Sequence, residues 1–323
     1  MSINIKGKNY EILDTLEKIT IADSFVVRQN KIGGGNGEAK LYIGNDNKDV
    51  RDFFGNKGFT IRCFLFKDDL VKYLDETKAE YLAPEQPYVN KQILPKLWNQ
   101  RKEEIEKLPQ VIEFEAIEQT QISGSRIYIK SSDKAYKIIR ELSLPNITYI
   151  SVIKLINEEN KLLYYFRLFA DYFGEIVHPY IIKQEREQIE DTDIDSTEKK
   201  QLYKARVGQG EYRKKLLELC PFCPITLVSD DRLLIASHIK PWISSDNFEK
   251  TDPFNGFIFT PTFDRLFDRG FLSFTNDKKT ILSPFLSNMT YSKLGISNNK
   301  IIPHLPIEGR EVYLEYHRKN IFK

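Results

Sequence analysis

A histidine, an asparagine and an aspartate follow one another in the C-terminal third of the chain, at His238, Asn255 and Asp264. His238 ends an apolar run, and an imidazole that ionises near neutral pH suits a general base acting on water. Asn255 is uncharged and both donates and accepts hydrogen bonds, so it can pin a loop or an imidazole tautomer. Asp264 offers the hard oxygen ligand that Mg²⁺ or Mn²⁺ prefers. Together these groups supply what phosphodiester hydrolysis requires.

Each of these residues also has an ordinary structural explanation when it is taken alone. A histidine at a strand end is commonly a hydrogen-bonded structural residue, and Asn255-Gly256 is a common turn pair. Asp264 and Asp268 have the i,i+4 spacing of an exposed helical pair. Their order within one segment is what favours catalysis.

Five short motifs surround these residues: Arg206–Gly210, Ala236–Trp242, Asn255–Gly256, Phe267–Gly270 and Tyr316–Arg318. With them, residues 206–322 resemble an HNH endonuclease domain of the restriction-endonuclease type, which has a ββα-metal active site. The resemblance implies DNA cleavage. It implies that His238 is the general base, that Asn255 is structural and that Asp264 binds the metal.

The residue before the base departs from the pattern of many HNH enzymes, which place Asp or His there as a second metal ligand. This chain has Ser237, and a hydroxyl is a weak ligand. We therefore expect one Mg²⁺ or Mn²⁺ per active site, held mainly by Asp264, substrate phosphate and water. Ser237 and Asp268 are further candidate ligands, although Asp268 has the alternative of pairing with Arg265 or Arg269.

The cysteines do not complete a zinc site. Cys220 and Cys223 have the spacing of half a site, but no second pair follows, and Cys63, His304 and His317 lack compact ligand spacing. We expect buried thiols and no structural zinc.

Basic side chains near these motifs are candidates for contacts with DNA phosphates. The candidates are Lys240, Arg265, Arg269, Lys31 and Lys40. The last two flank the glycine run 33–37, which lacks the spacing of a phosphate-binding loop and is better interpreted as a hairpin tip. Residues 205–323 carry 17 basic against 13 acidic residues, a bias too small to establish DNA binding.

The remaining elements predict an α+β fold. β-Branched and aromatic residues predict strands at Ser24–Arg28, Ala39–Ile43, Phe59–Phe66, Ile147–Ile156 and Leu162–Ala170. Apolar spacing predicts helices at Asp68–Leu74, Leu94–Ile105 and Tyr212–Leu219.

The chain of 323 residues is long enough for two domains. Between Lys183 and Glu198 there are seven acidic side chains and almost no apolar ones, which is typical of a solvated connection. We expect an N-terminal mixed α+β DNA-recognition region at 1–180, with a break between two subdomains near 90–110. An acidic linker at 181–204 then joins it to an HNH nuclease domain at 205–323.

Composition places the protein among soluble globular chains, with 41% hydrophobic and 29% charged residues. No membrane span or secretory leader is expected, and three cysteines indicate a reducing compartment. We expect a cytoplasmic protein with no membrane partner.

The most direct hypothesis is a type II restriction enzyme acting on double-stranded DNA. The alternatives are a modification-dependent endonuclease, a non-cleaving DNA-binding protein with a degenerate HNH fold, and an RNA-directed or non-specific toxin nuclease. A palindromic site would favour a homodimer, and a restriction system would include a cognate DNA methyltransferase.

Overall fold

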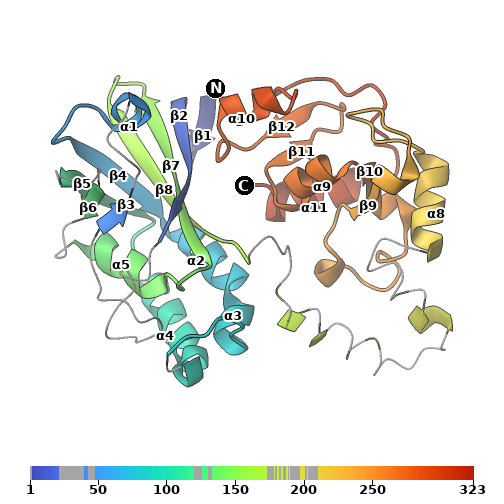
Figure 1. Ribbon diagram of the computed structural model, residues 1–323, viewed down its shortest axis with the longest axis horizontal. Helices are drawn as coiled ribbons and strands as arrows, with labels where there is room; N and C mark the ends of the chain where they lie inside the picture. Colours follow the sequence, from blue (N-terminus) through green and yellow to red (C-terminus); the bar gives the residue numbers. More distant parts are fainter. Residues whose placement is uncertain are drawn as a thin grey trace. The chain divides into compact units, whose positions relative to one another are not determined.

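The computed structural model describes residues 2–21, 40–42, 48–89, 91–119, 126–129, 133–172 and 210–323. Between residues 173 and 209 it describes only residues 178, 180, 181, 183, 184, 187, 189, 197–200 and 202. The chain forms two compact units, Met1–Tyr180 and Ile181–Lys323 (Figure 1).

The first unit is built on an eight-stranded sheet with the order β1-β2-β7-β8-β4-β5-β6-β3. Its strands are β1 (Ser2–Ile5), β2 (Lys8–Thr20), β3 (Lys40–Tyr42), β4 (Thr60–Phe66), β5 (Val111–Gln119), β6 (Arg126–Ile129), β7 (Thr148–Asn157) and β8 (Leu162–Ala170). Neighbouring strands are antiparallel except β4 and β8, which are parallel.

The helices of this unit pack on one face of the sheet. They are α1 (Lys48–Phe54), α2 (Lys67–Glu76), α3 (Lys78–Leu82), the short η2 (Lys91–Ile93), α4 (Leu94–Glu106) and α5 (Lys134–Leu142). Leu70 of α2, Trp98 of α4 and Ile139 of α5 join Phe166 and Val152 of the sheet in one buried cluster. Because strand side chains alternate, this cluster uses every second residue of the central strands.

Most of the predicted elements are present. β4, β7 and β8 fall on the predicted strands, β3 lies within 39–43, and α2 and α4 fall on the predicted helices. The predicted strand at 24–28 and the glycine run 33–37 lie outside the described residues.

Two features differ from the sequence expectation. A break between subdomains was expected near 90–110, but this segment holds α4, which packs on α2 and α3, and one sheet takes strands from both sides of it. The longest strand, β2, was missed because charged residues such as Glu11, Asp14 and Lys18 occupy its exposed positions. Pairing with β7 overrides this low strand propensity.

The second unit consists of short elements. In chain order they are α8 (Gly210–Leu219), η3 (Asp231–Leu233), β9 (Ile235–His238), η4 (Trp242–Ser244), η5 (Pro253–Asn255), β10 (Gly256–Phe259), α9 (Pro261–Asp268), β11 (Leu272–Phe274), β12 (Thr280–Leu282), α10 (Asn288–Lys293) and α11 (Glu311–Asn320). The predicted helix 212–219 is therefore present. Among the described residues no helix is both long enough and apolar enough to cross a membrane.

Candidate active site

The hairpin of β9 and β10, followed by α9, positions the predicted catalytic residues (Figure 1). The two strands are antiparallel, and Gly256 pairs with His238 while Phe257 pairs with Ser237. Phe257 and Phe259 are fully buried and pack against Phe267 of α9. This aromatic core fixes α9 against the hairpin, so residues distant in sequence are brought to one place.

Asn255 is fully buried and holds the loop that connects the two strands. Its Oδ1 accepts a hydrogen bond from the Lys240 amide at 2.8 Å. Its Nδ2 donates to the carbonyl of Glu249 at 3.0 Å, and the Lys240 carbonyl and the Ser245 hydroxyl each lie at 3.3 Å. All the polar atoms of the side chain are therefore used to pin residues 240–249.

The imidazole of His238 is held between aromatic rings and a backbone carbonyl. Its ring is stacked on that of Tyr212, with the centroids 4.3 Å apart, and the Trp242 ring meets it edge-on. Its Nε2 lies 3.0 Å from the carbonyl oxygen of Lys250. Because a carbonyl only accepts, Nε2 carries the hydrogen, and the lone pair of the neutral ring is on Nδ1. This tautomer gives His238 one defined basic nitrogen.

Two carboxylates of α9 lie beside the serine that precedes His238. The Ser237 hydroxyl donates to Asp268 Oδ1 at 3.3 Å and is also hydrogen-bonded to Asp264. Burial raises the pKa of Asp264, and the Ser237 hydrogen bond and Arg265 partly oppose this. Burial raises the pKa of Asp268 well above its ordinary value, and the charge of Asp264 raises it further. The two carboxylates are one turn apart and disfavour each other's ionised form.

This donor set fits a divalent cation. Asp264 is buried and Asp268 is half-buried, the pKa of each carboxyl is raised, and a hard cation bound by both would stabilise their ionised forms. Among the described residues, no group of three or more His, Cys, Asp or Glu side chains could hold a metal. Asp264, Asp268 and the weak ligand Ser237 would therefore leave several coordination positions to water or substrate.

The predicted DNA contacts have different surroundings. Lys240 is paired with Glu249, its Nζ lying 2.7 and 2.6 Å from the two carboxylate oxygens, so it stabilises the loop. Arg265 is exposed on α9, and Arg269 is half-buried. Lys31 lies outside the described residues, as does the side chain of Lys40.

Among the described residues, the cysteines and the remaining histidines of this unit belong to no group of three or more side chains that could hold a metal. Cys220 and Cys223 are buried, and burial raises the pKa of Cys220. His304 is exposed, with its ring against Phe222. His317 is buried, with its ring stacked on Phe267.

Sequence reasoning missed the residues that hold the site in place. Lys250 contacts His238 through its backbone carbonyl, so its residue type gives no indication of this contact in the sequence. Arg310 is buried and donates from Nε to the Gly256 carbonyl at 2.9 Å. At Gly256, an added Cβ would lie 2.3 Å from the Tyr212 hydroxyl and 2.8 Å from Leu216. The Asn-Gly pair was a visible signal, but the reason for its glycine is the close approach of α8.

A two-stranded hairpin followed by a helix, carrying a histidine, a buried asparagine and two carboxylates, defines the class of ββα sites. Residues 223–275 match the family model of the HNH endonucleases, and this segment contains the whole hairpin and α9. The C-terminal unit therefore contains an HNH endonuclease domain, which indicates nuclease activity on DNA. No family match covers the N-terminal unit, and no curated protein matches the chain.

Proposed function

We propose that this protein is a metal-dependent endonuclease that hydrolyses double-stranded DNA at specific sites, as a type II restriction enzyme does. In this proposal His238 Nδ1 is the general base that accepts a proton from the attacking water. The observation that carries the proposal is the hydrogen bond between His238 Nε2 and the Lys250 carbonyl at 3.0 Å. It supports catalysis because it selects the tautomer that a base needs.

The surroundings of His238 support the same role. Tyr212 is buried and is fixed by a hydrogen bond from its hydroxyl to the Asn255 carbonyl at 3.2 Å. Stacking on this ring restricts the imidazole to one orientation, which lowers the entropic cost of reaching the reactive geometry. Asn255 acts as a positioning residue. Its side chain binds the carbonyl of Glu249, the residue before Lys250, and so holds the part of the loop whose carbonyl contacts His238.

Asp264 and Asp268 would hold one Mg²⁺ or Mn²⁺, with Ser237 beside them. The cation would stabilise the charge that builds on the phosphate. HNH nucleases in general depend on a divalent metal, which agrees with the donor set. Asp264 would be the principal ligand. Asp268 would be the second ligand, because it lies one turn further along α9 and also contacts the Ser237 hydroxyl.

Site selection requires contacts with base edges or with DNA shape, which a hydrolytic site alone does not provide. We assign this role to the N-terminal unit, with residues 181–204 as the connection. Arg265 and Arg269 remain candidate phosphate contacts of the nuclease domain.

Cleavage of plasmid and phage DNA tests the proposal. Wild-type protein with Mg²⁺ or Mn²⁺ should give discrete fragments, and EDTA should prevent them. His238→Ala should lower the cleavage rate about 10²- to 10⁴-fold with little loss of DNA affinity. His304→Ala removes an exposed histidine of the same unit and should cut like wild type. Wild-type rates in His238→Ala would remove His238 from the mechanism.

A second candidate function is DNA binding without cleavage, and the observation that favours it is the weak ligand Ser237 at the position before the base. Under this alternative the same digests give mobility shifts and no fragments. Running the digests on methylated and unmethylated DNA also separates a modification-dependent endonuclease from one that modification blocks.

A further inference from the structure

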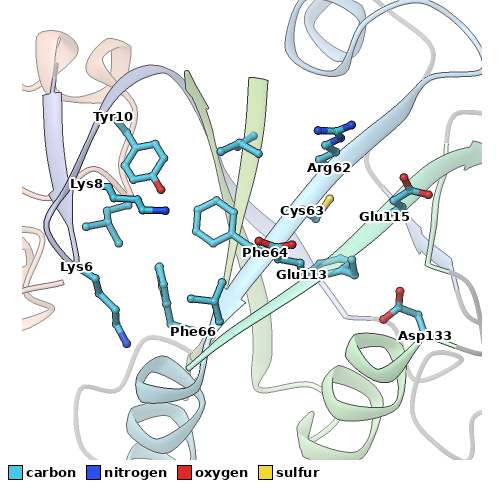
Figure 2. A pocket seen from close by; sticks show the side chains of 14 residues that line it. Lys6, Lys8, Tyr10, Arg62, Cys63, Phe64, Phe66, Glu113, Glu115 and Asp133 are labelled. Atoms are coloured by element: carbon cyan, nitrogen blue, oxygen red, sulfur yellow. The ribbon is translucent and has the colours of Figure 1, made fainter. Parts of the chain in front are cut away.

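The N-terminal unit contains a cavity of about 700 Å³ between the β1–β2 hairpin and strands β4 and β5. Figure 2 shows Tyr10 and Lys8 on the hairpin side, Phe64 at the centre, and Glu115 and Asp133 on the far side. A volume of this size lies within the range of sites for small organic ligands. The site belongs entirely to the first unit.

Aromatic rings form the apolar part of this cavity. Phe64 and Phe66 alternate along β4 with the core residues Cys63 and Leu65, so their rings lie on the opposite face. The ring of Phe64 is stacked on that of Tyr165 at 5.2 Å and lies 6.4 Å from the ring of Tyr10. Packing among these rings holds them rigid; Phe64 and Phe66 are buried, so Tyr10, which is half-buried, offers the ring surface that a flat ligand can reach.

The hairpin wall is fixed to the rest of the unit at its turn. Lys6 Nζ lies 2.9 Å from Asp68 at the start of α2 and 5.0 Å from the centroid of the Phe66 ring. Gly7 completes this turn at a φ of +82°. These contacts hold the strand that carries Lys8 and Tyr10 opposite β4.

The charged groups of the cavity are separated along its length. Lys8 extends inward from the hairpin side, and Glu113 lies beside Phe64, its cross-strand partner on β5 (Figure 2). Arg62 lies further along β4, opposite Glu115. Lys8, Arg62 and Glu113 are exposed, and none of the three makes an ion pair with a residue that the structure describes. The cavity thus offers a cation at one end, a carboxylate at its centre and aromatic rings between them.

From this arrangement we propose that the cavity binds a nucleotide unit. The aromatic rings stack on its base, Lys8 contacts its phosphate and Glu113 accepts a hydrogen bond from an exocyclic amine. A planar group with an anion at one end and a hydrogen-bond donor at the other complements all three features. Thymine lacks an exocyclic amine, so amino-bearing bases bind more tightly than thymine.

A nucleotide can reach the cavity either free in solution or as a base extruded from DNA. The second source rests on the proposed function, since it makes the cavity part of DNA recognition. Extrusion is least costly where a base is mismatched or unpaired. Mismatched duplexes therefore distinguish the two sources.

The first experiment is calorimetric titration of the full-length His238→Ala protein with dCMP, dAMP, dGMP and dTMP. We expect binding of the first three and weaker binding of dTMP. Tyr10→Ala and Glu113→Gln should each weaken binding about tenfold or more, and Lys8→Ala should weaken it in a salt-dependent way. Lys72→Ala on α2 and Glu103→Gln on α4 change exposed charges elsewhere in this unit and should have no effect.

The second experiment measures the affinity of the same proteins for matched duplexes and for duplexes with one mismatched pair. Tighter binding of the mismatched duplex, lost in Tyr10→Ala and Glu113→Gln, identifies DNA as the source of the nucleotide. Free-nucleotide binding with no mismatch effect identifies a free nucleotide as the ligand and still supports the cavity.

The proposal is overturned if no nucleotide binds at millimolar concentration and the three variants bind both duplexes like their parent. Cleavage by the wild-type protein is measured separately. If the wild type cuts DNA, no nucleotide binds and the variants bind and cut DNA like their parent, the cavity proposal fails and the nuclease proposal stands. If nucleotides bind but the wild type cuts no DNA, the cavity proposal stands and the nuclease proposal fails.

Discussion

The chemistry of single residues in the nuclease domain depends on the groups around them. His238 has a defined basic nitrogen because its Nε2–H donates a hydrogen bond to the Lys250 carbonyl, which leaves the lone pair on Nδ1. His317 lies in the same unit, but it is buried and its Nε2 and Nδ1 are bonded to the Phe267 carbonyl and the Ser273 hydroxyl, each at 3.0 Å. The two histidines therefore have different surroundings: His238 keeps a defined acceptor nitrogen, whereas both ring nitrogens of His317 are used in hydrogen bonds within the unit.

The carboxylate pair gives a prediction that does not depend on cleavage. Without metal, Asp268→Asn should leave the melting temperature unchanged or raise it, because burial and Asp264 disfavour the charged form of Asp268. Mn²⁺ should stabilise the wild type by about 2.7 kcal/mol at one hundred times its dissociation constant. Asp264→Asn and Asp268→Asn should lose most of this gain in thermal denaturation.

Two controls accompany this measurement. Asp277→Asn removes an exposed carboxylate of the same unit, and the double variant Cys220→Ser, Cys223→Ser removes the thiols. Both should keep the Mn²⁺ response. Equal stabilisation of all the variants by Mn²⁺ would place the metal elsewhere.

The burial of His317 should lower the free energy of unfolding in acid. Burial lowers its pKa to about 4, whereas in the unfolded chain it titrates near pH 6.5. The unfolded state therefore takes up a proton first, so this contribution to stability is complete above about pH 6.5 and is lost as the pH falls towards 4. It amounts to about 3 kcal/mol. Urea unfolding at several pH values should show a flatter dependence for His317→Gln, whereas His304→Gln should behave like wild type.

At the scale of elements, the loop between β9 and β10 decides whether the site is formed. The hairpin supplies His238 and Ser237, but the carbonyl that orients His238 belongs to the loop. The loop is held at several points by Asn255 and is closed by the Lys240–Glu249 ion pair. In the proposed mechanism, catalysis would therefore depend on a loop that acts through its backbone.

Asn255→Asp tests this dependence. The new carboxylate still accepts from the Lys240 amide but no longer donates to the carbonyl of Glu249, which is left opposite a negative charge. Two or more lost donor contacts to buried acceptors should cost about 2 kcal/mol or more, and cleavage should fall with stability in denaturation and digestion assays. Asn247→Asp, an exposed change in the same loop, should affect neither. Full cleavage by Asn255→Asp would show that the loop needs no such pin.

The whole chain is divided into two compact units. The N-terminal unit has its own sheet, helices and cavity, and the C-terminal unit has its own aromatic core around Phe257, Phe259 and Phe267. Each has the buried cluster that independent folding requires. A division between recognition and cleavage is compatible with this organisation.

Limited proteolysis tests the division. The first cuts should fall between Lys183 and Lys204, because Lys183, Gln184, Glu187 and Lys200 are exposed and the segment is polar. Any DNA cleavage that the released C-terminal fragment retains should no longer be site-selective. Resistance of that segment, with first cuts within residues 205–323, would contradict the proposed boundary.

Local sequence patterns determined much of the fold. Strands β4, β7 and β8 and helices α2, α4 and α8 follow from propensity and apolar spacing, and the HNH segment follows from the order of His238, Asn255 and its neighbours. Strand β2 was missed because the charged residues at its exposed positions have low strand propensity. Its pairing with β7 stabilises the strand, and this pairing is a tertiary contact.

The amino-acid sequence shows which residue types are available for chemistry and in what order, because motif order along the chain is a one-dimensional property. Tertiary structure alone decided that a carbonyl of Lys250 orients His238, that Asp268 shares Ser237 with Asp264, and that Lys240 is paired with Glu249. It also decided that Tyr10, Phe64 and Glu113 line one cavity. Backbone atoms carry no residue-type signal, and contacts between distant segments arise only when the core packs.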